Sequence, residues 1–427
     1  MNILVIGNGG REHALAWKIR ESPLCQKVYV APGNAGTAIV AENVPIDVND
    51  FEGLGKFCLE RSVELIVVGP EGPLVNGIRD FFEDTPALKH ILMIGPNKLG
   101  AQLEGSKDYS KQFMLRHGIP TAKARTFGAS DLTHALDYIS SCKPPIVLKA
   151  DGLAGGKGVI ISLSQGEAKA VIKEMLVNKK FGAAGSKVLI EEFLNGIELS
   201  VFVLTDGKDY VILPEAKDYK RIGDGDIGPN TGGMGAVSPV IFADAAFMAK
   251  IEELIVKPTI IGLNKERINY KGFIFAGIMN VGGNPYVIEY NARMGDPETQ
   301  AVMPRIKSDF VELLLATAKG ELMNKNIEIH DHFTVTVALV SGGYPGEYET
   351  GKIIHGLENA QATVFHAGTL KRSDHVLTHG GRVLSISGKG RSLSEAREHA
   401  YKTAAQINWE GLYFRRDIGQ DLMNYKG

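Results

Sequence analysis

The chain has 427 residues, of which 44% are hydrophobic and 22% are charged, and its formal net charge is −2. This length exceeds one ordinary hydrophobic core, so we expect two to four domains of a globular, cytoplasmic protein. The low net charge argues against broad nucleic-acid binding, which needs a basic surface, and no apolar run is long enough to span a membrane. Three cysteines without metal-ligand spacing favour reduced thiols. We expect a monomer, with a weak dimer as the alternative.

The first 100 residues alternate short apolar strands with helical segments, which is typical of a doubly wound parallel sheet. Strands are predicted at residues 3–6, 27–30, 65–68 and 91–94. Ligands of such sheets bind outside the carboxyl ends of the strands. Asn34 and Glu71 follow two of these ends and are therefore candidates to contact a ligand.

The turn after the first strand, GNGGR at residues 7–11, has the glycines of a phosphate-binding turn. A dinucleotide fingerprint needs a third glycine where Glu12 stands, so a single phosphate is the better ligand. The backbone of Gly9 and Gly10 and the charge of Arg11 would bind it. The alternative is an ordinary helix start in which Arg11 pairs with Glu12 or another neighbour.

Residues 99–117 are predicted to form one helix, which carries Lys107. A small α+β module follows at residues 121–192, with the glycine loop DGLAGGKG (151–158) between two strands. This spacing departs from a Walker loop, and the kinase signatures His-Arg-Asp and Asp-Phe-Gly are absent from the sequence. We expect the loop to move and to close over a phosphate ligand; the alternative is a flexible hairpin tip.

Residues 286–300, YVIEYNARMGDPETQ, begin as a buried strand and become polar. Side chains alternate along a strand, so Glu289 and Asn291 point to one face and offer oxygen ligands for Mg²⁺. Arg293 could reach the same side and hold a carboxylate or a phosphate. The alternative is a polar strand end whose charges pair with one another.

Six motifs, in order along the chain, resemble the ATP-grasp superfamily and, within it, the glycinamide ribonucleotide synthetase (phosphoribosylamine–glycine ligase) family. They are GNGGREHALAW (7–17), LEGSK (103–107), KADGLAGGKG (149–158), IEEFL (190–194), GPNTGGMGA (228–236) and GDPETQ (295–300). Each motif is weak alone, but together they occur in family order from the first strand to about residue 300.

The resemblance implies an α/β multidomain ATP-grasp fold. Its parts would be a Rossmann-like substrate domain (1–100), a central domain (101–120 and 193–326), a lid (121–192) and a small C-terminal domain (327–427). The implied reaction joins glycine to 5-phosphoribosylamine through glycyl phosphate, and gives glycinamide ribonucleotide, ADP and phosphate in purine biosynthesis.

The resemblance also implies a role for individual residues. Mg²⁺ or Mn²⁺ would be bound by Glu289 and Asn291, and the catalytic residues would be Arg293, Lys149 and Asp218. ATP would contact Lys107, Lys149, Gly155, Gly156, Lys157, Glu191, Phe193, Leu194 and Glu198. The other substrates would contact Gly9, Gly10, Arg11, Asn34, Glu71, Lys220 and Arg221.

Two features depart from the family pattern. Residues 217–221 read KDYKR, where relatives often read QDHKR, so Lys217 and Tyr219 are substituted. The strand predicted to pair with Glu289, at residues 272–281, has no carboxylate. Phosphate oxygens and water would therefore fill more of the metal's coordination shell.

Three other functions compete with this prediction. A nicotinamide oxidoreductase is disfavoured by the missing third glycine and by the second phosphate loop. A regulatory nucleotide-binding module would need none of the chemistry assigned to Glu289 and Arg293. Another ATP-grasp purine enzyme would activate formate or bicarbonate instead of glycine.

Overall fold

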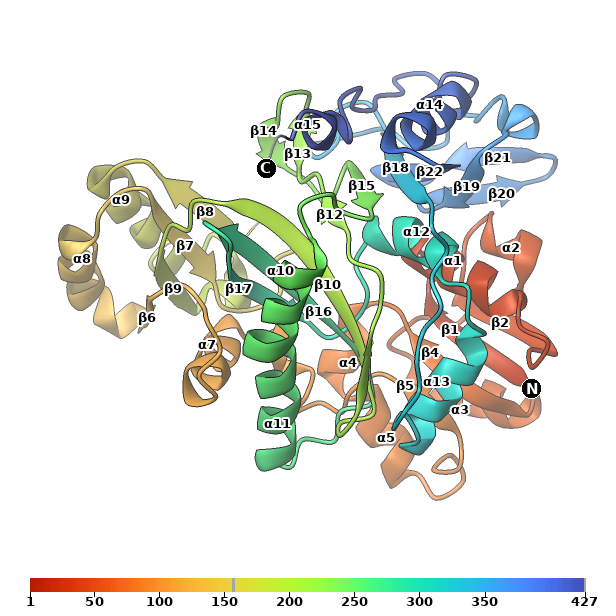
Figure 1. The fold of residues 1–427 in the computed structure, drawn as a ribbon, viewed down its shortest axis with the longest axis horizontal. Helices are drawn as coiled ribbons and strands as arrows, with labels where there is room; N and C mark the ends of the chain where they lie inside the picture. The colour runs from red at the N-terminus through yellow and green to blue at the C-terminus, as the bar shows by residue number, and fades with distance from the viewer. Residues whose placement is uncertain (156–157, 426–427) are drawn as a thin grey trace.

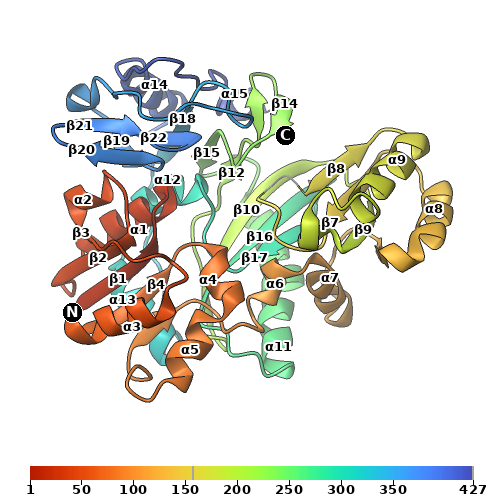
Figure 2. The ribbon, with the colours of Figure 1, turned by 180° about the vertical axis from the view of Figure 1, so that it is seen from behind.

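The computed structural model describes residues 1–155 and 158–425. Its N-terminal part is a parallel sheet in the order β3-β2-β1-β4-β5, with helices on both faces (Figures 1 and 2). The doubly wound sheet predicted from the sequence is therefore confirmed. Its elements are β1 (Asn2–Gly7), α1 (Gly10–Arg20), β2 (Lys27–Pro32), α2 (Thr37–Val40), β3 (Glu42–Asn43), α3 (Phe51–Glu60), β4 (Val63–Val68), α4 (Glu71–Asn76), α5 (Ile78–Asp84) and β5 (Leu92–Ile94).

Alternation along the strands explains why both faces of this sheet are covered. In β1, Ile3 and Val5 belong to one buried cluster with α1, whereas Leu4 and Ile6 belong to another with α3 and α5. Helix α13 (Phe310–Lys319), which we expected in the central domain, joins the cluster of α1. Its periodicity predicts a buried face, but not the sheet that this face covers.

The central part is an antiparallel sheet in the order β11-β10-β16-β17, with α10 packed against β17. Its elements are α6 (Gln102–Gly105), α7 (Lys107–Arg116), β10 (Ile197–Thr205), β11 (Tyr210–Ile212), α10 (Ala245–Ile251), a π-helical turn (Glu252–Val256), α11 (Lys257–Lys265), β16 (Gly272–Val281), β17 (Asn284–Asn291), α12 (Glu298–Val302) and a 3₁₀ turn (Met303–Arg305).

The lid is a separate lobe, at the left of Figure 1, with its own sheet in the order β6-β9-β7-β8. It also has its own hydrophobic core, which includes Ile146, Leu148 and Ile172. A lobe that buries its apolar side chains internally can change its position as a unit. Its elements are β6 (Ala124–Gly128), a 3₁₀ turn (Ala129–Asp131), α8 (Leu132–Ser141), β7 (Ile146–Ala150), β8 (Val159–Ser162), α9 (Gln165–Leu176), a 3₁₀ turn (Gly182–Gly185) and β9 (Lys187–Glu192).

The C-terminal part is built on an antiparallel sheet in the order β12-β15-β18-β22-β19, covered by α14. Strands β12 and β15 come from residues that we expected in the central domain, so the ranges 193–326 and 327–427 share one sheet. The elements are β12 (Lys217–Asp218), β13 (Arg221–Gly223), β14 (Ile227–Asn230), β15 (Gly235–Ser238), β18 (Phe333–Val340), a 3₁₀ turn (Leu357–Asn359), β19 (Thr363–His366), β20 (Thr369–Arg372), β21 (His375–Thr378), β22 (Arg382–Gly390), α14 (Leu393–Ala404) and α15 (Gln420–Met423).

The single helix predicted at residues 99–117 is wrong, because the chain breaks at Ser106 between α6 and α7. The Ser106 hydroxyl accepts a hydrogen bond from the backbone amide of Tyr109 and so caps α7. It also donates to the carboxylate of Asp151, at 2.9 Å. The break therefore depends on a partner from the lid, which the local sequence pattern does not show.

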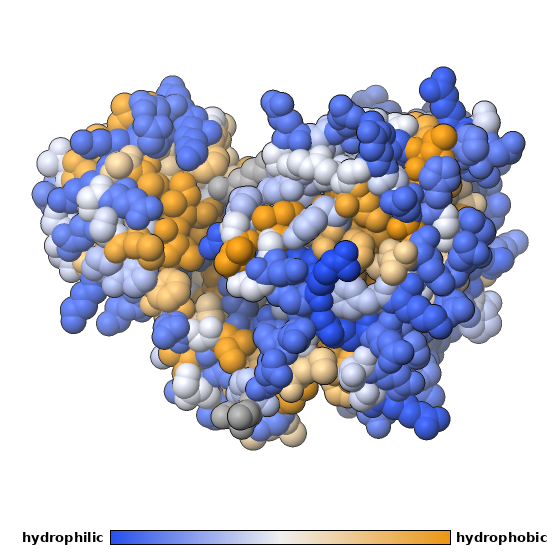
Figure 3. Space-filling model, turned by 90° about the horizontal axis from the view of Figure 1, so that it is seen from above, coloured by the Kyte–Doolittle hydropathy of each residue, from blue (hydrophilic) through white to orange (hydrophobic). Residues whose placement is uncertain are grey.

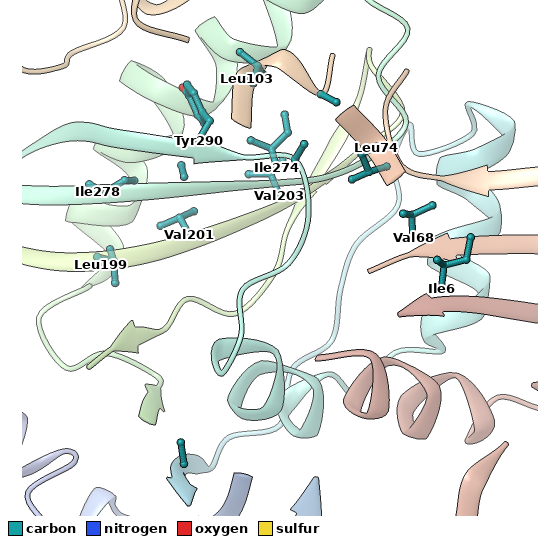
Figure 4. Packing of buried hydrophobic residues seen from close by; sticks show 14 of the residues in the cluster. Ile6, Val68, Leu74, Leu103, Leu199, Val201, Val203, Ile274, Ile278 and Tyr290 are labelled. Atoms are coloured by element: carbon teal, nitrogen blue, oxygen red, sulfur yellow. The ribbon is translucent and has the colours of Figure 1, made fainter. Parts of the chain in front are cut away.

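One hydrophobic core joins the N-terminal and central sheets. Figure 4 shows Ile6 and Val68 of the first sheet near Leu74 of α4, with Val203 and Ile274 of the central sheet beyond them. All three cysteines are free thiols. Within the described residues, no helix has both the length and the apolar character needed to span a membrane.

Candidate active site

A cavity of about 750 Å³ lies where the lid, the central sheet and the N-terminal domain meet. Its described lining residues include most of the sequence-predicted set. From that set, the cavity brings together Arg11, Glu71, Lys107, Lys149, Gly155, Glu191, Phe193, Leu194, Glu198, Asp218, Lys220, Arg221, Glu289, Asn291 and Arg293. Gly156 and Lys157 lie outside the described residues.

Two lysines at the lid side of the cavity share one carboxylate. Glu191 of β9 receives Lys149 Nζ at 2.7 Å and Lys111 Nζ at 2.9 Å, and all three side chains are at most 5% exposed. Burial alone would raise the pKa of Glu191, but the two ammonium groups hold this pKa below its ordinary value. Lys149 also donates to the backbone carbonyl of Ile288, next to Glu289, at 3.0 Å. Glu191 therefore fixes Lys149 between the lid and β17.

Lys107 stands at the start of α7, directly after the helix break. Its ammonium donates to the carbonyl of Gly152 at 3.3 Å, and its backbone amide donates to the carbonyl of Asp151. Burial, opposed by the nearby carboxylate of Glu289, lowers the pKa of Lys107. The break at Ser106 thus brings a lysine from the central domain to the first residues of the glycine loop.

The two candidate metal ligands line the cavity from β17. The backbone register of β17 against β16 shifts near Gly277, opposite Glu289. The side-chain nitrogen of Asn291 is buried and has no hydrogen-bond partner among the described residues, so the amide of Asn291 is free to turn its oxygen toward a cation. No group of three or more His, Cys, Asp or Glu residues that could hold a metal occurs in the described part of the chain. The residues thus suit a cation that draws further ligands from phosphate and water.

A network of alternating charges lies opposite the lid. Lys220 Nζ donates to the carboxylate of Glu198 at 2.5 Å. Burial opposes the charge on Lys220, but Asp218 and Glu198 raise its pKa well above the ordinary value. Burial and the neighbouring carboxylate of Asp218 raise the pKa of Glu298 to about 7. A carboxyl group in this range can exchange a proton at neutral pH.

Arg293 is held by acids from two other elements. Its guanidinium lies 2.7 Å from Glu104 of α6 and 3.3 Å from Glu71 of α4. Burial opposes the charge, yet these two carboxylates raise the pKa of Arg293 above its ordinary value. The charge of Arg293 is balanced by these two carboxylates. Its ion pair with Glu71 joins the central domain to the N-terminal domain, and Arg293 also lines the cavity.

The first glycine turn is organised by Glu12. Its carboxylate accepts a hydrogen bond from the backbone amide of Gly9 at 2.7 Å and from Arg11 Nε at 2.5 Å. It also fills the space beside Gly7 and Gly69, where an added Cβ would lie within 2.6 Å of its side chain. The Arg11–Glu12 pair is the contact that the alternative interpretation of this turn expects, and the Glu12 side chain lies beside the glycines where a third glycine of a dinucleotide fingerprint would stand.

Three predicted substrate residues lie outside the cavity lining. A side chain added at Gly9 would meet Glu12 and Asp296, and one added at Gly10 would meet Gln300. Asn34 is buried and uses its amide group on backbone, donating to the carbonyls of Asn8 and His366 and accepting from Gly36 and Thr37. These residues shape the turn beside the cavity.

Sequence reasoning missed Lys111, Glu104 and Glu298 as members of the site. Glu104 and Glu298 belong to motifs that we recognised, LEGSK and GDPETQ, so that signal was present. Lys111 lies one turn of α7 after Lys107, on the same helix face, which is a signal that helix periodicity offers.

Part of the cavity wall is formed by apolar side chains. Leu153, Ile161 and Phe193 are each 38–39% exposed and line it. In Figure 3, apolar atoms gather on the left lobe, on the side that faces the rest of the molecule. A flat aromatic ligand would bury this surface, while the charged groups beyond it would meet a polar tail.

A separate lid lobe beside a cavity in which lysines and carboxylates meet fits the arrangement of an ATP-grasp enzyme. The biotin carboxylase domain of Hydrogenobacter thermophilus 2-oxoglutarate carboxylase has the same fold, with a TM-score of 0.73, 17% identity and coverage of 100% of this chain and 99% of that one.

Three family descriptions match consecutive parts of the chain. The N domain of phosphoribosylglycinamide synthetase matches residues 1–104, its ATP-grasp (A) domain residues 105–299 and its C domain residues 334–421. The chain therefore belongs to the phosphoribosylglycinamide synthetase family.

Full-length relatives agree with this assignment. Phosphoribosylamine–glycine ligases of Yersinia pestis and Escherichia coli (strain K12) are 46% and 47% identical over 426 residues, which is 98% of each chain. The crystal structure of the phosphoribosylamine–glycine ligase of Thermotoga maritima has a TM-score of 0.86 and 37% identity, and covers 98% of this chain and 100% of that one. The resemblance stated from the sequence motifs is thereby confirmed.

Proposed function

We propose that this protein is an ATP-dependent ligase that joins glycine to 5-phosphoribosylamine, and gives glycinamide ribonucleotide, ADP and phosphate in purine biosynthesis. The observation that carries the proposal is the single cavity shared by three domains, in which lysines and carboxylates face one another. Relatives that match the whole chain bear the name of this activity.

ATP would lie between the lid and the central sheet. Phe193 and Leu194 would meet the adenine and Glu198 the ribose, while Lys107 and Lys149 would bind the phosphates, with Gly155, Gly156 and Lys157 covering them. Glu191 contributes by holding Lys149 in place. A divalent cation held by Glu289 and Asn291 would neutralise phosphate charge when bound.

The reaction would proceed in two transfers. One carboxylate oxygen of glycine attacks the γ-phosphorus, the bond to ADP breaks, and glycyl phosphate forms. The amine then attacks the carbonyl carbon, phosphate leaves, and the amine loses a proton. Asp218 and Glu298 would accept that proton, and Arg293 would orient the carboxylate of glycine.

The amine substrate would bind on the N-terminal side of the cavity. Arg11, Lys220 and Arg221 would bind its phosphate, and Glu71 would contact its sugar. Gly9, Gly10 and Asn34 would act by shaping the turn that carries Arg11. The Arg11 guanidinium meets Glu12 and the Met294 carbonyl through two of its nitrogens, and its third would be left for the phosphate.

A phosphate-release assay tests the proposed function. Release should require both glycine and phosphoribosylamine, generated in the assay from ammonia and ribose 5-phosphate. Formate and bicarbonate, offered in place of glycine, should support no release above background. Equal rates with formate or bicarbonate would identify a different ATP-grasp activity, and release without any acceptor would indicate a simple ATPase.

A further inference from the structure

The C-terminal end of the chain reaches back to the strand that carries Asp218. Asp421 of α15 accepts a hydrogen bond from the Tyr219 hydroxyl at 2.5 Å and lies 3.0 Å from Lys217 Nζ. Figure 1 shows α15 beside β13 and β14, near β12. The Asp421 carboxylate thus holds Lys217 and Tyr219, the residues on either side of the proposed proton acceptor Asp218.

The two residues held by Asp421 also contact each other. Lys217 Nζ lies 3.7 Å from the centre of the Tyr219 ring, so the ammonium is placed between an aromatic face and a carboxylate. Tyr219 is only 4% exposed, and its backbone pairs with β15 at Met234 and Gly235. A buried ring anchored in this way fixes the path of the chain from Asp218 to Lys220.

Lys217 stands at the border between this cluster and the cavity. It belongs to the lining of the cavity, and its positive charge acts on the carboxyl groups of Glu198 and Asp218. Without Asp421, the Lys217 ammonium would lose its ion-pair partner and would be left to the attraction of these cavity carboxylates. It would then compete with Lys220 for Glu198.

A second contact holds the adjoining hairpin. Arg415 makes two parallel hydrogen bonds to Asp417, at 2.8 Å each, and its remaining nitrogen reaches Asp226 at 3.0 Å and the backbone carbonyl of Arg221 at 3.1 Å. Arg415 is fully buried. The C-terminal segment therefore contacts the stretch from Lys217 to Asp226 through both Asp421 and Arg415.

We propose that Asp421 is a positioning residue: by holding Tyr219 and Lys217, it directs Asp218 and Lys220 into the cavity and keeps the Lys217 ammonium from the cavity carboxylates. The effect on catalysis rests on the proposed function. The effect on the position of residues 217–231 does not.

Asp421→Asn tests the proposal, because it keeps an acceptor for Tyr219 and removes the charge that holds Lys217. We expect kcat to fall by about tenfold, within the loss of up to about 10²-fold that misplaced groups cause, and KM for ATP to rise by a smaller factor, because Glu198 is also the proposed ribose contact. Lys325→Gln is the matched control, since it breaks the surface pair of Lys325 with Glu312 and should leave kcat unchanged. An unchanged kcat in Asp421→Asn, or a loss that merely follows unfolding, would overturn the proposal.

Rescue and hydrogen exchange separate positioning from general stability. Lys217→Met in the Asp421→Asn background should restore most of kcat, because the released ammonium is then absent. Amide hydrogen exchange of residues 217–231 should be faster in Asp421→Asn than in the wild type and unchanged in Lys325→Gln. Failure of rescue or unchanged exchange contradicts the proposal. Wild-type protein that shows no glycine-dependent phosphate release contradicts the proposed function instead.

Discussion

Glu289 supplies the one carboxylate of the candidate metal pair, and Asn291 beside it is uncharged. We expect the Glu289→Gln variant to bind ATP with a modest loss of affinity and to show a kcat lowered by about 10²-fold or more. A divalent cation stabilises the transition state by several kcal/mol, and each 1.36 kcal/mol changes the rate tenfold. Nucleotide binding by calorimetry and steady-state kinetics would measure the two effects. Glu321→Gln, at an exposed position, is the control. Wild-type turnover at saturating Mg²⁺ would exclude the metal assignment.

Glu298 provides a test by pH. The pKa of the Glu298 carboxyl group is raised from 4.5 to about 7 in the folded state. The contribution of protonated Glu298 to the free energy of unfolding is therefore complete below about pH 4.5, and it is lost as the pH rises through about 7. Glu298→Gln stays neutral, so its melting temperature relative to wild type should be higher at pH 8 than at pH 5. Each kcal/mol regained should raise the midpoint by roughly 2 °C, the scale for large domains. An equal difference at both pH values would contradict the assignment.

Site residues that stand in local sequence motifs could be predicted, whereas their ion pairs with residues distant in the sequence could not. Lys149 and Glu289 stand in motifs with a local pattern, so their type and spacing predict their chemistry. The position of Lys149 depends on its ion pair with Glu191, which also pairs with Lys111; these two partners come from a strand and a helix far apart in the chain. Likewise, Arg293 is balanced by Glu104 and Glu71. Such pairings follow from topology, which a single sequence does not contain.

At the scale of elements, the lid is the part expected to move. It has a separate core, and contacts such as Lys149 to the Ile288 carbonyl and Asp151 to Ser106 join it to the central part. We expect the loop at residues 151–158 to close over bound nucleotide, which would shield an acyl phosphate from water. Its cleavage by a non-specific protease should therefore slow markedly when MgATP is added. GTP serves as the control nucleotide, and equal cleavage rates with and without ATP would contradict closure.

Most strands and helices could be predicted from periodicity, and the exceptions share a cause. The strand at Ile146–Ala150 and the hairpin of Gly272–Val281 with Asn284–Asn291 follow the predicted pattern within one residue. The break at Ser106 does not, because the Asp151 carboxylate that stabilises it lies in the lid. Local propensity determines where a helix begins and ends unless a hydrogen bond to a residue distant in the sequence is more favourable.

At the scale of the whole molecule, the parts of the chain exchange elements beyond the split central domain (101–120 and 193–326) that the sequence predicts. Strands β12 and β15 complete the C-terminal sheet, and α13 covers the N-terminal sheet. Hydrophobic patterns predict that these segments are buried, but they do not predict which sheet each segment packs against. This exchange of elements has a functional consequence, because it places groups from all parts of the chain around one cavity.

The central claim is that this cavity activates the carboxylate of glycine by phosphorylation, and an isotope measurement tests it most directly. Glycine labelled with ¹⁸O in both carboxylate oxygens would be converted with ATP and phosphoribosylamine, and the released phosphate analysed by mass spectrometry. Attack by the carboxylate on the γ-phosphorus, followed by cleavage of the carbon–oxygen bond, predicts one ¹⁸O atom in each phosphate. Phosphate without ¹⁸O would contradict the acyl phosphate route and, with it, the proposed roles of Lys149, Asp218 and Arg293.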